Sequence, residues 1–101
     1  MAKKSSIEKN NRRKRMADQY AKKRAELKAT ALNESLSLEE RFAARIKLAK
    51  LPRNSAPSRV RNRCEISGRP RGYYRKLKMS RIAMRDYGAA GAIPGLVKSS
   101  W

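Results

Sequence analysis

Residues 53–85 read RNSAPSRVRNRCEISGRPRGYYRKLKMSRIAMR and hold eleven Arg or Lys side chains against a single acid, Glu65. Gly68, Pro70 and Gly72 lie in the middle of this stretch, and neither residue type sustains a regular helix. Such a density of guanidinium groups weakens a compact state by self-repulsion unless a polyanionic partner neutralises it. The stretch therefore predicts an irregular fold that binds a polyanion, and RNA is the polyanion that we expect.

The composition of the whole chain supports this expectation. The chain has 101 residues, with 27 Lys or Arg, 8 Asp or Glu and a formal net charge of +19. Fourteen of its forty hydrophobic residues are Ala, so few large side chains are left to build a core. We expect an extended fold that depends on its partner, because ordering such a chain is offset mainly on binding.

Cysteine and histidine usage excludes several kinds of site. The single Cys rules out a disulfide within the chain and favours a reducing compartment, and the absence of His removes the usual metal ligand and catalytic base. No window approaches the roughly 20 apolar residues that span a bilayer. We expect neither a membrane segment nor a signal peptide.

The cations fall in two blocks, because the net charge is +8 for residues 1–30, +1 for 31–52, +9 for 53–82 and +1 for 83–101. Ser5 and Glu8 resemble a capping box that opens a helix running to about Ala31. The cations of residues 12–15 fan out around every face of this helix, beside a narrow stripe of Met16, Tyr20, Leu27 and Ala31. We expect phosphates to surround it. The alternative is a solvated helix with pairs such as Lys22 and Glu26.

A second, nearly neutral helix is expected to follow. Ser37 and Glu40 form another capping box, and Leu38, Phe42, Ile46 and Ala49 recur at helical spacing. Pro52 should end the helix at Leu51. We expect Phe42 and Ile46 to pack against the first helix, which gives this segment a structural role.

Beyond the loop at 53–57, residues 58–64 read as an extended run. Arg59, Arg61 and Arg63 would then point to one face, about 7 Å apart, which suits successive phosphates. The alternative is a solvated edge on which the arginines alternate by chance.

The turn at Gly68–Gly72 is followed by residues that suit RNA and by a last short helix. Tyr73 and Tyr74 adjoin Arg75 and Lys76, so rings can stack on bases while the cations hold phosphates, although one Tyr is expected to anchor the core instead. The last helix should begin at the N-cap Ser80 and end at Gly88 or Gly91. Within it, packing is expected from Ile82, Met84 and Tyr87, with Arg81 and Arg85 facing outward.

Four positions have the spacing of a zinc knuckle but lack its ligands. Cys64, Ser67, Ser80 and Ala83 occupy the frame, and three of the four lack the thiolate or imidazole that zinc requires. We expect no metal and no other cofactor.

Several motifs resemble the family of bacterial small ribosomal subunit protein fourteen. They are Arg61-Asn62-Arg63-Cys64, the run Ser67-Gly68-Arg69-Pro70-Arg71-Gly72-Tyr73-Tyr74-Arg75-Lys76, Met79-Ser80-Arg81-Ile82, and the ending from Ile93-Pro94-Gly95-Leu96 to Ser100-Trp101. The resemblance covers nearly the whole chain. Because Ser67, Ser80 and Ala83 replace cysteines of the short, zinc-binding branch, the chain resembles the long, zinc-free branch.

The resemblance implies a structural constituent of the small ribosomal subunit. It would bind rRNA in the head near the decoding region, beside ribosomal proteins three, ten and nineteen, and support assembly. The expected location is the ribosome of the bacterial cytoplasm, and the alternative is an organellar ribosome. The fold class that we expect is mostly α, extended and irregular, with two N-terminal helices, a zinc-ribbon-like module lacking metal, and a short C-terminal helix and tail. Residues 1–52 would form a basic helical extension and residues 53–101 the rRNA-binding module.

The predicted RNA contacts share a positive charge or a stackable ring. They are Arg12, Arg13, Lys14, Arg15, Lys22, Lys23, Arg24, Arg53, Arg59, Arg61, Arg63, Arg69, Arg71, Tyr73, Tyr74, Arg75, Lys76, Lys78, Arg81 and Arg85.

Other function classes fit the sequence less well. An enzyme is not expected, because Cys64 has no His to act as its base and the acids are scattered. No small-molecule substrate is expected either. An architectural DNA-binding protein of the nucleoid is the alternative that charge alone permits. A membrane-active peptide would need a wide apolar face, which the first helix lacks.

Overall fold

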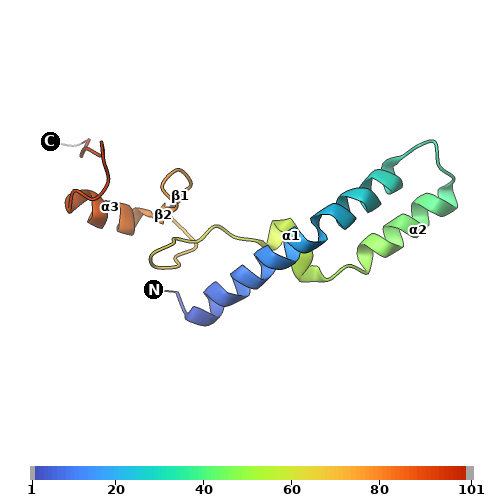
Figure 1. The fold of residues 1–101 in the computed structure, drawn as a ribbon, viewed down its shortest axis with the longest axis horizontal. Coiled ribbons are helices and arrows are strands. Elements are labelled where there is room, and N and C mark those ends of the chain that lie inside the picture. Colours follow the sequence, from blue (N-terminus) through green and yellow to red (C-terminus); the bar gives the residue numbers. More distant parts are fainter. Residues whose placement is uncertain (1, 100–101) are drawn as a thin grey trace. The chain divides into compact units, whose positions relative to one another are not determined.

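A computed structural model describes residues 2–99; Met1, Ser100 and Trp101, with the end of the motif Ser100-Trp101, lie outside the described residues. The elements along the chain are the helices α1 (Lys4–Leu32) and α2 (Leu38–Ala49), the short 3-10 helices η1 (Arg53–Ser55) and η2 (Pro57–Arg59), the strands β1 (Tyr73–Tyr74) and β2 (Met79–Ser80), and the helix α3 (Arg81–Ala89) (Figure 1). The prediction of a mostly helical chain is confirmed. None of the helices in residues 2–99 has both the length and the apolar character that a membrane span requires.

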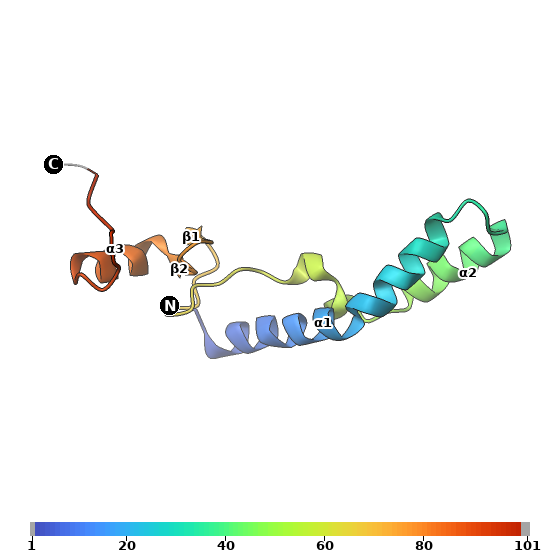
Figure 2. The same ribbon diagram turned by 45° about the horizontal axis from the view of Figure 1, so that its top comes forward.

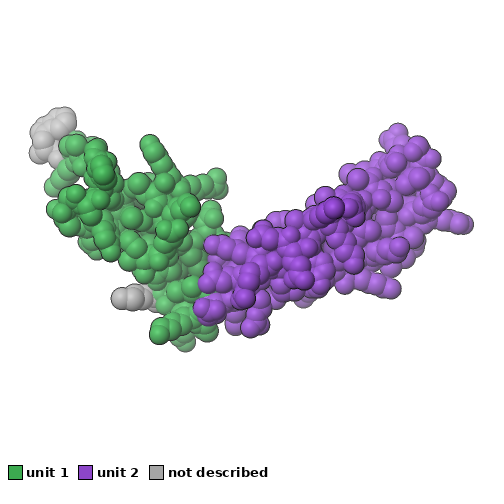
Figure 3. All heavy atoms as spheres, in the orientation of Figure 1, with its two compact units in different colours: residues 1–7, 61–101 green, residues 8–60 purple. Residues whose placement is uncertain are grey.

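The described residues form two compact units (Figure 3). Residues 8–60 make up the helical unit, which holds most of α1 together with α2, η1 and η2. The hairpin unit holds the N-terminal residues through Ile7 and the chain from Arg61 onward, with β1, β2 and α3. The first residues of the chain therefore belong to the same unit as its C-terminal part.

In the helical unit, α2 runs back antiparallel beside the C-terminal half of α1 (Figures 1 and 2). The residues buried there are small, since Ala31 is 5% exposed and Ala44 is 4% exposed. The guanidinium Nε of Arg41 adds a link by donating to the Ala31 carbonyl at 3.1 Å. The contact between the two helices is therefore made by small buried side chains and by the Arg41 hydrogen bond.

The expectation that Phe42 and Ile46 pack against the first helix is wrong. Phe42 is 63% exposed and Ile46 is 41% exposed. The helical period correctly places these residues on one face, but that face points away from the small-residue contact made by Ala44.

The helix boundaries follow local capping where the cap is a side chain. Ser37 is the N-cap of α2, and its Oγ accepts from the Glu40 N–H at 3.4 Å, as predicted. The helix ends at Ala49, two residues before the predicted end. The capping role predicted for Ser5 is wrong: α1 already begins at Lys4, and the backbone N–H groups of Ser6 and Ile7 donate to the Lys3 carbonyl.

The hairpin unit is built on a two-stranded antiparallel ribbon. Tyr73 lies opposite Ser80 and Tyr74 opposite Met79, and the turn places Lys78 at a φ of 55°. Ser80 also caps α3, because its Oγ accepts from the Ala83 N–H at 3.3 Å. The cap and the helix that follows it confirm the prediction from the sequence.

The predicted end of α3 is confirmed, but the packing predicted for two of its side chains is not. The helix stops at Ala89, and Gly91 follows at a φ of +74°, in the left-handed region that a C-terminal Gly was expected to supply. By contrast, Ile82 and Tyr87 are 45% and 41% exposed, so the packing predicted for them is wrong. The buried residue of α3 is Ala83.

Candidate nucleic-acid interface

Most of the predicted contact residues lie on the surface. Five of the twenty are half-buried and fifteen are exposed. The half-buried residues are Arg13, Arg24, Arg63, Arg69 and Tyr73, and the exposed ones are Arg12, Lys14, Arg15, Lys22, Lys23, Arg53, Arg59, Arg61, Arg71, Tyr74, Arg75, Lys76, Lys78, Arg81 and Arg85.

Four exposed cations of the hairpin unit have no ion-pair partner among residues 2–99. Among the carboxylates of residues 2–99, none lies within ion-pair distance of Arg75, Lys76, Lys78 or Arg85. Unpaired charges of one sign, held close together, produce a positive potential that attracts phosphates. These four cations therefore give this part of the chain a positively charged surface.

Three arginines hold the loop of residues 68–72 in place. The Nε of Arg61 donates to the Pro70 carbonyl at 3.2 Å, and an Nη of Arg63 donates to the Gly68 carbonyl at 3.0 Å. The Nε of Arg69 donates to the Arg71 carbonyl at 3.2 Å. A guanidinium carries five N–H groups, so each of these bonds leaves further donors on the same side chain.

The predicted row of Arg59, Arg61 and Arg63 along one extended face is wrong. Arg59 closes the 3-10 helix η2, and Arg63 is half-buried because it binds the Gly68 carbonyl. The preference of Pro57 for the first turn of a helix explains the change, since it starts η2 where an extended run was expected.

The glycines of the loop have the backbone conformation that the sequence predicts. Gly68 and Gly72 have φ values of +77° and +61°. The Gly72 carbonyl accepts from the Arg81 N–H at 2.6 Å, and a Cβ on Gly72 would lie 3.3 Å from the Arg81 side chain. The fold thereby brings the first residue of α3 against the loop, so that Arg81 joins the cations of residues 69–76.

The two adjacent tyrosines have different surroundings. Tyr73 is half-buried, whereas Tyr74 is 49% exposed. Successive residues of a strand point to opposite faces, so only one of the two rings can face solvent fully. Tyr73 is thus the anchoring residue, and Tyr74 is the ring available for stacking.

On α1, two of the predicted contact residues face the protein instead of solvent. An Nη of Arg24 donates to the Oγ of Ser55 at 2.9 Å, which joins α1 to η1. The Nε atoms of Arg13 and Arg24 are buried, and no group among residues 2–99 accepts a hydrogen bond from either. Ser55 itself is 1% exposed. Ser55 was missed by the sequence reasoning, because nothing near it in the sequence indicates a partner 31 residues away.

The positions of the zinc-knuckle frame come together around Cys64. The Ser67 N–H points at the Cys64 Sγ at 3.5 Å, and the Gly68 N–H donates to the Cys64 carbonyl at 2.9 Å. Cys64, Ser80 and Ala83 are buried. No cluster of three or more His, Cys, Asp or Glu side chains that could hold a metal occurs in the described part of the chain.

The Cys64 thiol is unusually acidic. Burial by itself raises the pKa of this thiol. Hydrogen bonds from the Ser67 side chain and from the backbone N–H groups of Ser67, Ser80 and Ile66 lower the pKa by a larger amount, so that it falls from an ordinary value of 9.0 to about 6. The sulfur is thus surrounded by donors that suit a thiolate, which is the form that zinc-binding cysteines take.

Comparison with known proteins adds independent information. Residues 47–100 match the model of the family described as ribosomal protein S14p/S29e. Over the full length of both chains, the protein is 76% identical to the small ribosomal subunit protein uS14 of Hyphomonas neptunium and 68% identical to that of Mesorhizobium japonicum. It is 69% identical, again over both full lengths, to the protein of the same name from Beijerinckia indica.

Proposed function

Because the chain belongs to the ribosomal protein S14p/S29e family, we propose that its uncompensated cations neutralise phosphates of small-subunit rRNA. The protein is a structural constituent of the small ribosomal subunit, in the ribosomes of the bacterial cytoplasm. Its role is structural, as for the family. The alternative of an architectural DNA-binding protein has no support from the relatives.

The observation that carries the proposed mode of binding is the loop of residues 68–72 with its neighbouring cations. The loop backbone is fixed by arginine side chains, while Arg75 and Lys76 remain exposed beside it and Tyr74 offers a ring. A fixed backbone with cations and an exposed ring fits folded RNA, in which phosphates and unstacked bases lie close together. The predicted contact residues are proposed to bind rRNA, whereas Arg24 and Arg63 act mainly through hydrogen bonds to the protein's own elements.

We propose that the residues around Cys64 are a zinc-ribbon-like module that needs no metal. Hydrogen bonds to the Cys64 sulfur and the N-cap at Ser80 support this proposal, because they link the same positions that a zinc ion would link. Residues 53–101 would carry the main rRNA contacts, and residues 1–52 would act as the basic extension.

The resemblance to the family supports a finer placement, which is also proposed. The protein would lie in the head of the small subunit near the decoding region, with ribosomal proteins three, ten and nineteen as neighbours. Its contribution there would be assembly and support of the rRNA conformation.

The test of the proposed function is a salt titration of binding to small-subunit rRNA. If affinity comes from phosphates, log K should fall linearly with log salt concentration, with a slope of roughly 0.7 to 0.9 per phosphate contacted. The double variant Arg75→Gln/Lys76→Gln should lower the slope by roughly 1.4 to 1.8, because each neutralised cation removes about one phosphate contact.

Lys47→Gln is the matched control, because Lys47 is an exposed cation of α2 outside the predicted contacts. It should leave the slope nearly unchanged. A slope near zero for the unaltered protein would contradict the phosphate mechanism, and equal slopes for the double variant and the unaltered protein would contradict the assignment of these two residues.

A further inference from the structure

The outward face of α2 is an apolar stripe that the protein itself leaves uncovered. Leu38, Phe42 and Ile46 follow one another at four-residue intervals and are 80%, 63% and 41% exposed. Elsewhere in the helical unit the buried residues are small, so these are large apolar groups placed where they contribute no core. Large exposed apolar groups gathered on one face are typical of interaction sites.

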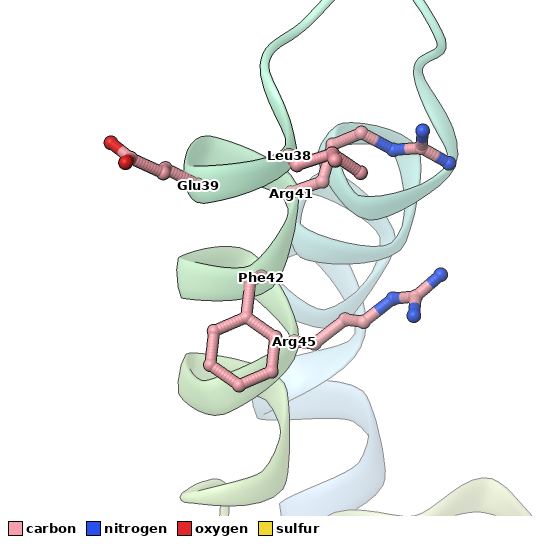
Figure 4. Close-up of a pocket in the computed structure, with 5 residues that line it drawn as sticks. All are labelled: Leu38, Glu39, Arg41, Phe42 and Arg45. Carbon is pink, nitrogen blue, oxygen red and sulfur yellow. The ribbon is translucent and has the colours of Figure 1, made fainter.

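A hollow of about 380 Å³ lies on this face. It is lined by Leu38, Glu39, Arg41, Phe42 and Arg45. Figure 4 shows Arg41 and Arg45 extending to the same side of α2, while Glu39 points to the opposite side. The hollow therefore has an apolar floor beside Phe42 and a cationic wall on one side.

The guanidinium groups of Arg41 and Arg45 keep nitrogens that bond to no group among residues 2–99. The Nε of Arg41 is fixed on the Ala31 carbonyl, which restricts the side chain and leaves its two terminal nitrogens without a partner among residues 2–99. The Arg45 guanidinium likewise has no hydrogen-bond or ion-pair partner among these residues. Two guanidinium groups one helical turn apart suit carboxylates, which they can bind through paired N–H groups.

We infer that the α2 face binds a protein segment that places an apolar side chain in the hollow and Asp or Glu carboxylates against Arg41 and Arg45. The exposed apolar side chains of Leu38, Phe42 and Ile46 favour a protein over RNA here, because a phosphate backbone laid along the face would leave them without an apolar partner. Leu38 and Ile46 have no ring for a base to stack on, whereas both gain from covering by an apolar side chain.

The inference goes beyond phosphate binding, but it rests on the proposed function in one respect: the partner is taken to belong to the small subunit.

Aromatic and Arg residues at the centre of such a face are those that most often dominate binding energy. Loss of the Phe42 ring should therefore weaken docking roughly thirtyfold, which corresponds to about 2 kcal/mol.

The experiment replaces Phe42 by p-benzoylphenylalanine in cells, and small subunits are purified and irradiated. We expect a cross-link to one ribosomal protein, within a segment that has an apolar residue flanked by Asp or Glu. Leu32, which is 71% exposed at the end of α1 and does not line the hollow, is the matched control and should not link to that segment.

The charge requirement is tested on the same cross-link. Arg45→Glu should lower its yield about tenfold. Lys47→Glu changes the charge by the same amount on the same helix, outside the hollow, and should have little effect. Replacing the carboxylates of the linked segment by Lys should restore the yield in the Arg45→Glu variant.

The outcomes separate the two proposals. Recovery of the labelled protein in the small subunit tests the proposed function by itself. If it is recovered there but links from position 42 only to rRNA, or to no molecule at all, or to a protein segment without carboxylates, the inference about the α2 face is overturned while the proposed function stands.

Discussion

A side chain added at Gly68 should open the hairpin unit. Gly68 has a φ of +77°, and a Cβ there would lie 2.6 Å from Ile7 Cδ1, 2.9 Å from Ile7 Cγ1 and 3.2 Å from Ala2 Cβ. The left-handed backbone costs about 1–2 kcal/mol for a residue with a Cβ. The overpacking against Ile7 adds about 1–2 kcal/mol, at the lower end of the usual range because the Cδ1 methyl can move. The total predicted for Gly68→Ala is about 2–4 kcal/mol.

Cys64 is the probe for this prediction, because it is the only Cys in the chain and is 3% exposed. If modification requires opening of the unit, the rate of thiol labelling is proportional to the population of the open form. Gly68→Ala should then label roughly thirtyfold to several hundredfold faster than the unaltered protein at the same pH.

Gly91→Ala is the matched control, since Gly91 also has a positive φ of +74° but a Cβ there would meet nothing within 4 Å. It should cost only the backbone term of about 1–2 kcal/mol. Adding Ile7→Ala to Gly68→Ala removes the two closest atoms and should recover part of the loss, as a double-mutant cycle would show. Equal labelling rates for Gly68→Ala and Gly91→Ala would refute the argument that the N-terminal segment packs on this loop.

Three further predictions concern the helical unit, the thiol and the absence of a metal. Ser55→Ala should lower the stability of the helical unit by about 1–3 kcal/mol, since it leaves the half-buried Arg24 guanidinium without its acceptor. Ser58→Ala, at an exposed position, should leave the stability unchanged. Urea unfolding followed by helical circular dichroism measures both variants. The pKa of Cys64 falls from 9.0 to about 6 on folding, so the unfolded state binds more protons than the folded state between these two pH values. The stability of the hairpin unit should therefore rise from about pH 6 to 9, and the contribution of the thiolate should be lost as the pH falls through 6. Cys64→Ser should abolish this dependence, and a thiolate absorbance midpoint near 9 in the folded protein would contradict it. A chelator should change neither rRNA binding nor Cys64 labelling, and stoichiometric zinc in the purified protein would contradict the proposed metal-free module.

The features that the sequence determined are those set by neighbours along the chain. The N-caps Ser37 and Ser80 were predicted correctly, because each bonds to a backbone N–H three residues ahead and needs no distant partner. The left-handed glycines of the loop at 68–72 followed from residue type alone. The family was also indicated by short motifs, and the comparisons confirmed it.

Only the tertiary structure decided which faces are covered. The helical period places Phe42 and Ile46 on one face, yet it cannot say whether the protein or another molecule covers that face, and here the small residue Ala44 makes the internal contact. The bond from Arg24 to Ser55 likewise depends on how the chain folds back on α1. Charge and periodicity are local properties of a sequence, whereas burial depends on which residues the fold brings together. The polyanion-binding character could therefore be predicted from the sequence. The division between anchoring and exposed side chains could not.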